Sequence, residues 1–83
     1  MNESNLSYTE VMILGKITAQ MAGRIIELKV NEGDTVAKGQ TVIVLESMKM
    51  EMPITASIFG TVKEVNCVTG DAVASGAVLM EIE

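Results

Sequence analysis

Few side chains in this sequence could do chemistry, and one lysine stands out among them. There is no histidine, and Cys67 is the only cysteine, so the usual ligands of a zinc site are missing. No phosphate-binding glycine loop, dinucleotide fingerprint or nucleophile–base pair is present. The stretch LESMKMEM, however, holds Lys49 between Met48 and Met50. Methionine usually fills cores, whereas an ammonium group in a buried strand would be costly, so the pattern needs another explanation.

An internal repeat indicates where Lys49 lies. Residues 16–46 align without a gap with residues 53–83. The identical positions are Ile17, Thr18 and Ala19 with Ile54, Thr55 and Ala56; Gly23 with Gly60; Glu27 with Glu64; Gly33 and Asp34 with Gly70 and Asp71; Val36, Ala37 and Gly39 with Val73, Ala74 and Gly76; and Glu46 with Glu83. Repetition with the glycines in register indicates two copies of one structural unit.

Each copy is expected to form four short strands. Valine and isoleucine dominate, and no apolar stripe at helical spacing is long enough for a helix. The matched segments NEGD and VTGD, like AKGQ and ASGA, are turn signals, and the glycine beside Asp34 and Asp71 predicts that these carboxylates cap turns. One copy cannot close a core alone. We therefore expect residues 16–83 to form a flattened, antiparallel all-β barrel-sandwich of two pseudo-twofold-related halves packed face to face.

Alternation along the strands predicts which side chains face the core. The residues expected to point inward are Leu28, Val30, Ile43, Leu45, Val65, Cys67, Met80 and Ile82, and those expected to point outward are Glu46, Glu81 and Glu83. Ile25 and Val62 break the two-residue phase of these positions, which predicts a bulge near Glu27 and Glu64.

Lys49 falls at the junction between the two copies. The segment TVIVLES leads into the junction and MEMPITA leads out of it, so the simplest connection is a tight antiparallel hairpin with Lys49 at its tip. The pseudo-symmetry then places the chain termini at the opposite end. Residues 1–15 precede the first copy, and we expect them to form a leader or an extra edge segment.

The composition argues against several classes of partner. A formal net charge of −5, with no basic stripe or row of aromatic residues, argues against nucleic acid and anionic membrane surfaces. The start of the chain lacks the basic flank of a signal peptide and an apolar run long enough to span a membrane. A single cysteine allows no intramolecular disulfide. A reducing cytoplasm is therefore the expected location. We also expect the protein to be monomeric in isolation.

The segment ESMKME resembles the biotin-attachment motif of biotinyl carrier domains, in which a Met-Lys-Met triplet lies on a hairpin turn. ITAQMAGRI and ITASIFGTV are similar to the family's two Ala-Pro-x-x-Gly stretches, and NEGDTVAKGQTV is similar to its Glu-Gly-Asp-x-Val-x-x-Gly-Gln segment. The resemblance covers residues 17–83. Gln20 and Ser57 depart from it, since the family usually has proline at these positions.

This resemblance implies a biotin carrier of a biotin-dependent carboxylase, without catalytic activity of its own. Lys49 would carry biotin in amide linkage, attached by a biotin protein ligase. The biotin would then shuttle carboxyl groups between a biotin carboxylase and a carboxyltransferase. The residues implied in recognition by these partners are Met48 and Met50, with Glu46, Ser47 and Glu51 as possible further contacts.

Two other functions stay open from the sequence. Related lipoyl domains share the fold and carry lipoate at the same lysine, but they usually have Asp-Lys-Ala around it, so Met48 and Met50 favour biotin. The second alternative is an unmodified domain that serves only as a protein-interaction module, and the presence of Lys49 within the motif disfavours it.

Overall fold

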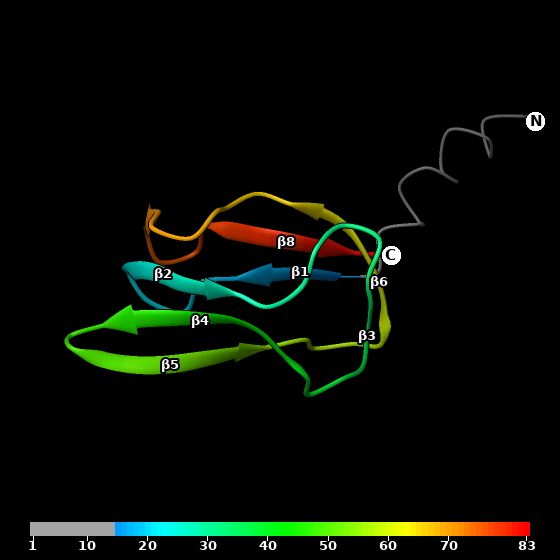
Figure 1. The fold of residues 1–83 in the computed structure, drawn as a ribbon, viewed down its shortest axis with the longest axis horizontal. Coiled ribbons are helices and arrows are strands. Elements are labelled where there is room, and N and C mark those ends of the chain that lie inside the picture. The colour runs from blue at the N-terminus through cyan, green and yellow to red at the C-terminus, as the bar shows by residue number, and fades with distance from the viewer. Residues whose placement is uncertain (1–14) are drawn as a thin grey trace, which may run out of the picture.

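The computed structural model describes residues 15–83, and all the regular structure in this range is β-strand (Figure 1). The strands are β1 (Gly15–Thr18), β2 (Gly23–Leu28), β3 (Thr35–Val36), β4 (Thr41–Ser47), β5 (Met50–Thr55), β6 (Gly60–Val65), β7 (Ala72–Val73) and β8 (Val78–Ile82). They form two four-stranded antiparallel sheets, ordered β1-β8-β6-β3 and β5-β4-β2-β7. The predicted all-β sandwich is confirmed. The prediction for residues 1–15 lies outside the described residues except at Gly15, which begins β1.

The two copies of the repeat interleave in both sheets. The first copy supplies β1 to β4 and the second supplies β5 to β8, yet each sheet takes two strands from each copy. The expectation that each copy forms one face is therefore wrong in this detail. An outer strand such as β1 finds its hydrogen-bond partner, β8, only in the other copy, so strand exchange satisfies backbone groups that one copy alone would leave unpaired.

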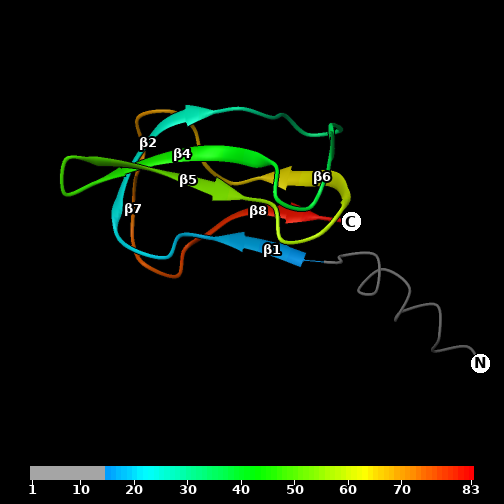
Figure 2. The same cartoon turned by 90° about the horizontal axis from the view of Figure 1, so that it is seen from below.

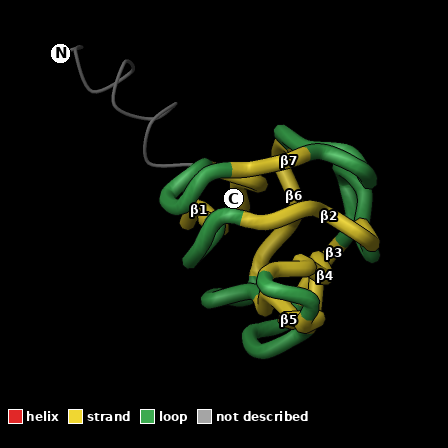
Figure 3. The backbone as a smooth tube through the Cα atoms, turned by 90° about the vertical axis from the view of Figure 1, so that its left-hand side faces the viewer, coloured by secondary structure: helices red, strands yellow, loops and turns green. Residues whose placement is uncertain are grey.

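The strand register repeats the sequence symmetry. Ile17 of β1 lies opposite Met80 of β8, and the equivalent Ile54 of β5 lies opposite Ile43 of β4. The shift that the phase break predicted is present in both copies, at Glu27 in β2 and at the equivalent position in β6. Figure 2 shows the two layers that result, and Figure 3, seen from the end where β4 meets β5, shows only strands and loops in the described chain. None of the described residues forms a helix that could cross a membrane.

The core between the layers consists of aliphatic side chains. Ile43, Leu45, Met80 and Ile82 are at most 1% exposed, as alternation predicted. The two predicted inward residues that are only partly buried are Leu28 and Val65, each at the end of its strand. The predicted outward glutamates are exposed at Glu46 but half-buried at Glu81 and Glu83. Glu81 lies on β8 opposite Lys16 of β1 and Glu64 of β6.

The turns have the backbone that the glycine pattern predicts. Gly33 and Gly70 have φ values of 93° and 99°, in the left-handed region that glycine adopts without steric cost. The neighbouring carboxylates close these turns: the backbone N–H of Asn31 donates to Asp34 at 2.9 Å, and that of Val68 donates to Asp71 at 2.9 Å. The two aspartates therefore cap turns, as predicted from the sequence.

Cys67 occupies the core position that Val30 has in the first copy. The Cys67 side chain is 5% exposed, and its Sγ lies 3.9 Å from the carbonyl oxygen of Leu79. Burial, with a smaller contribution from the negative charge of Asp71, raises the pKa of the thiol above its usual value of 9.0. The thiol is therefore neutral and shielded, which suits a core side chain and not a nucleophile.

We predict that Cys67 in the folded protein reacts with iodoacetamide at pH 8 at least roughly ten times more slowly than in denaturant, because only the accessible thiolate is nucleophilic.

The raised pKa of Cys67 in the folded state also has a consequence for stability. The contribution of the buried neutral thiol to the free energy of unfolding is fully present below pH 9. It declines as pH rises through 9 and above, because the thiol of the unfolded chain ionises first. Cys67→Val is the matched control: it should cost less than about 1.5 kcal/mol and should abolish this alkaline decline in urea titrations. Equal labelling rates in the folded and unfolded states would contradict the assignment.

Candidate functional site

Lys49 lies at the tip of the hairpin formed by β4 and β5, as predicted. Ser47 and Met50 are the last paired residues, so the turn consists of Met48 and Lys49 alone. Their φ values are 55° and 65°, which is the type I′ geometry that matches the twist of a two-residue hairpin. The tip projects at one end of the sandwich, and the C-terminus lies at the opposite end (Figure 1).

The turn adopts a conformation that its two side chains disfavour. Type I′ turns prefer Asn-Gly, because both central residues need positive φ. Met48 and Lys49 are the only non-glycine residues with positive φ among residues 15–83. Holding a residue other than glycine in this region costs on the order of 1–3 kcal/mol. The strand pairing below the turn must supply that energy, so the tip is held in one conformation at the expense of stability.

We predict that Met48→Asn raises the free energy of unfolding by roughly 0.5–1 kcal/mol, because asparagine tolerates the left-handed region better than methionine does. Urea denaturation measures this change. Met50→Asn, at the neighbouring exposed position in extended backbone, is the matched control and should give no gain. Stabilisation by both substitutions to the same degree would point to polarity rather than to backbone conformation.

The tip presents an accessible amine between two exposed methionines. Met48 is 87% exposed and Met50 is 66% exposed, although each is apolar. Lys49 is also exposed, and within residues 15–83 it forms no salt bridge and donates no side-chain hydrogen bond. Exposed methionine is a flexible, polarizable contact surface. The arrangement therefore offers a free amine framed by side chains that can adapt to different protein surfaces.

Ser47 anchors the base of the tip. It is only 9% exposed, and its Oγ donates a hydrogen bond of 2.8 Å to the carbonyl oxygen of Ala22, in the loop between β1 and β2. Gly23, at the start of β2, strengthens this attachment, because a Cβ there would collide with the carbonyl oxygen of Glu46 and close approach needs glycine. These contacts fix the end of β4 against β2. They give Ser47 a structural role, while its predicted contact with partners stays a prediction.

We predict that Ser47→Ala lowers the free energy of unfolding by about 0.5–1.5 kcal/mol, since it removes a part-buried hydrogen bond. If the hydroxyl serves structure alone, the initial rate of any ligase-catalysed acylation of Lys49 should stay within twofold of wild type at a temperature where both proteins are folded. Thermal unfolding and mass-spectrometric initial rates give the two readouts. An unchanged stability together with a slower acylation would instead support the recognition role.

Two glutamates flank the tip at matched positions. Glu46 of β4 and Glu51 of β5 lie directly opposite each other in the hairpin, and both are exposed. Like charges directly opposite in a sheet are destabilising. On its other side Glu46 lies opposite Arg24 of β2, which places one positive charge beside the pair. The like-charge pair is a further feature of the tip that does not serve stability.

The loop between β1 and β2 also belongs to this end of the molecule, which the sequence did not indicate. Met21 in this loop is 37% exposed, and the adjacent Ala22 accepts the hydrogen bond from Ser47. Met21 aligns with Ile58 in the repeat, so its type suggested an ordinary apolar position. The alternation of apolar and polar residues does not distinguish Met21 from an ordinary apolar position. Among residues 15–83 there is no cluster of side chains suited to a metal ion.

Comparison with known proteins agrees with this geometry. A family profile described as biotin-requiring enzyme matches residues 13–82, which include the repeat and the hairpin tip. The chain belongs to the biotin- and lipoyl-attachment family. This confirms the resemblance inferred from ESMKME and, at the level of the family, the prediction that the cofactor is biotin.

Relatives of the domain include both short and very long proteins. The biotin/lipoyl attachment protein of Bacillus subtilis is 50% identical over 66 residues, which are 80% of this chain and 90% of that protein. Pyruvate carboxylase 1 of Caenorhabditis elegans is 44% identical over 71 residues, which are 86% of this chain but 6% of that enzyme. The methylmalonyl-CoA carboxyltransferase 1.3S subunit of Propionibacterium freudenreichii is 60% identical over 37 residues, or 45% of this chain and 30% of that subunit.

Solved structures place the same fold within large carboxylases. The urea carboxylase of Kluyveromyces lactis matches with a TM-score of 0.78 and 30% identity, over 83% of this chain and 6% of that one. A single-chain, multi-domain long-chain acyl-CoA carboxylase matches with a TM-score of 0.76 and 30% identity, over 81% of this chain and 7% of that one. This chain therefore spans only 6–7% of the length of the pyruvate, urea and long-chain acyl-CoA carboxylases that it matches.

Proposed function

We propose that Lys49 is the attachment site of biotin and that this domain carries carboxyl groups between two active sites of a biotin-dependent carboxylase. The observation that carries the proposal is the position of Lys49: an exposed amine, without a partner among residues 15–83, at the tip of a two-residue hairpin. The family match and a 48% identical relative over 40 residues, the biotinylated protein TB7.3 of Mycobacterium tuberculosis, support the choice of biotin. The domain itself has no catalytic role in this proposal.

Attachment is an acyl transfer to the amine of Lys49. The amine nitrogen attacks the carbonyl carbon of biotinyl-adenylate, the bond from that carbon to the phosphate oxygen breaks, and AMP leaves. The ammonium group gives up two of its three protons, the first to a base that the biotin protein ligase supplies, and a neutral amide with one N–H remains. The domain contributes only a reachable amine held in a fixed direction, which lowers the entropic cost of the encounter. Bound biotin then supplies a ring nitrogen that accepts and releases a carboxyl group.

The surroundings of Lys49 fit recognition by more than one partner. The ligase, the biotin carboxylase and the carboxyltransferase must each accommodate the same tip. Met48 and Met50 provide adaptable apolar contacts for them, and the opposed Glu46 and Glu51 provide fixed negative charge. Because the tip projects from the end of the sandwich, it can enter a deep active site while the rest of the domain stays outside. The carrier acts as a monomer in the cytoplasm.

The test is intact-mass measurement after co-expression with a biotin protein ligase and excess biotin. We expect wild type to gain one biotinyl group and Lys49→Ala to gain none. Lys63→Ala, which removes an exposed strand lysine elsewhere, is the matched control and should be modified as completely as wild type. Equal modification of the Lys49→Ala protein, or no modification of wild type, would overturn the proposal. A lipoyl-sized gain on Lys49 in lipoate-fed cells would favour the lipoyl alternative.

A further inference from the structure

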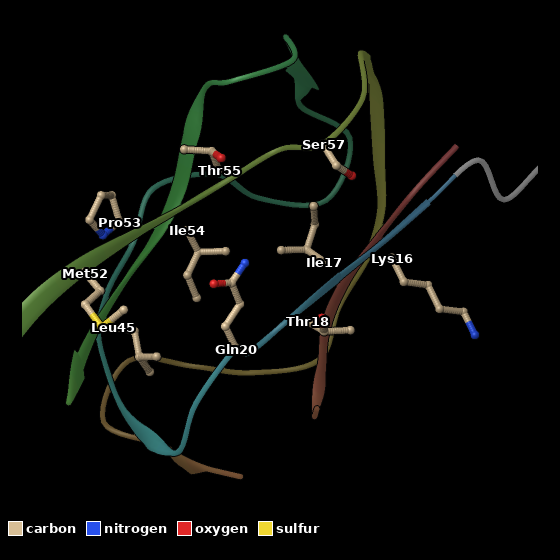
Figure 4. A pocket seen from close by; sticks show the side chains of 10 residues that line it. All are labelled: Lys16, Ile17, Thr18, Gln20, Leu45, Met52, Pro53, Ile54, Thr55 and Ser57. Carbon is tan, nitrogen blue, oxygen red and sulfur yellow. The ribbon is translucent and has the colours of Figure 1, made fainter. Parts of the chain in front are cut away.

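A groove lies along the open side of the sandwich. β1 and β5 are the outer strands of their respective sheets, so each has one edge without a neighbouring strand. A groove with a volume of about 200 Å³ is lined by residues of both strands and by the loops that follow them (Figure 4). Its lining residues are Lys16, Ile17, Thr18, Gln20, Leu45, Met52, Pro53, Ile54, Thr55 and Ser57.

The groove is lined by polar and apolar side chains in equal number, and one of the polar ones is the exposed amide of Gln20. Figure 4 shows Leu45, Met52, Ile54 and Ile17 around its centre and the side chain of Gln20 projecting between them. Among residues 15–83 no partner hydrogen-bonds the side-chain amide of Gln20, although its backbone carbonyl accepts a hydrogen bond from the Oγ of Ser75 at 3.3 Å. A primary amide offers both N–H donors and a carbonyl acceptor. The site therefore suits a small ring that has both an apolar part and an amide-like group.

An apolar row leads from the hairpin tip into this groove. Met50, Met52 and Ile54 alternate along β5, so they share one face of the strand. Their exposure decreases along the row, from 66% at Met50 to half-buried side chains at Met52 and Ile54. Met50 flanks Lys49, and Met52 and Ile54 line the groove. The groove is therefore continuous with the surface beside the acceptor lysine.

The arm on Lys49 has the length to reach the groove. In biotinyl-lysine the ring is about eleven bonds from Cα, nearly the bond count of four extended backbone residues, which span roughly 13 Å. Along β5 the distance from Lys49 is roughly 10 Å to Met52 and roughly 17 Å to Ile54 at the usual rise per residue. An arm folded back along the apolar row therefore ends between these two residues, beside the Gln20 amide.

We propose that this groove receives the ureido ring of the biotin that Lys49 carries, so that the arm alternates between a docked and an extended state. The inference rests on the biotinylation proposed above. The ureido carbonyl accepts a hydrogen bond from the Gln20 amide, and a ring N–H donates to the Gln20 Oε1. The hydrocarbon and thioether part of the ring contacts Met52 and Leu45. Because pockets for drug-sized ligands are typically 300–1,000 Å³, a groove of about 200 Å³ suits one compact ring system.

Docking is tested by NMR on the biotinylated protein, once intact mass has established that one biotinyl group is present. We expect chemical-shift differences from the unmodified protein at the Gln20 side-chain amide and the Met52 methyl group, and nuclear Overhauser contacts between that methyl group and the biotin ring. Shift differences confined to residues 47–50, without these contacts, would overturn docking while leaving biotinylation intact. A protein without the mass gain would overturn both proposals.

Two variants separate docking from a general effect of modification. Gln20→Leu keeps a side chain of similar size but removes the amide, so the biotinylated variant should lose the ring contacts to Met52 and should still gain the same mass. Asn66→Leu is the matched control, because it makes the same change from an amide to an apolar side chain at an exposed residue outside the groove. It should leave the contacts unchanged. Contacts that persist in Gln20→Leu would overturn the role of the amide, and the wild-type comparison needs neither variant to fold.

Discussion

The fold depends on strand pairing between the two copies of the repeat. β2 pairs with β4 and β6 with β8 inside the copies, but the outer strands pair only across them. Neither copy can satisfy its backbone hydrogen bonds or cover its apolar face alone, so the two must fold as one unit. The β4–β5 hairpin is the pairing across which the chain passes directly from one copy to the other. Lys49 therefore lies on the connection between the two copies.

The hairpin tip departs from the rules that the rest of the molecule follows. Elsewhere in residues 15–83, positive φ is taken by glycine, large apolar side chains are mostly buried and aspartates close their own turns. At the tip, Met48 and Lys49 adopt positive φ, Met48 and Met50 are exposed, and Glu46 faces Glu51. Local departures of this kind are expected at functional sites, where they are stabilised by the surrounding structure. Their concentration within six consecutive positions, 46–51, supports a functional tip independently of any resemblance.

The sequence predicted what is local or repeated, and it did not predict what depends on partners distant in the chain. The turns at Gly33 and Gly70, the shifts in β2 and β6 and the hairpin tip follow from residue type, phase and repetition. The interleaving of the copies could not be predicted, because the same inward-facing residues fit pairing within a copy or between copies. The hydrogen bond from Ser47 to Ala22 joins residues 25 positions apart, and alternation carries no signal for it. The groove between β1 and β5 likewise exists only once both sheets are placed.

The way in which the pseudo-symmetry is broken explains why a ring would reach the groove only from the end of the molecule that carries the β4–β5 hairpin. β1 and β5 are equivalent strands, and the groove is lined by equivalent pairs such as Ile17 with Ile54 and Gln20 with Ser57. A symmetric groove would accept a ring from either direction. The symmetry is broken because the hairpin tip exists at one end alone, and the described chain ends at Glu83 at the other (Figure 1). Met52 and Leu45, which line the groove without an equivalent partner in it, come from the two strands of that hairpin. The repeat thus builds the groove, and the position of Lys49 decides from which side it is filled.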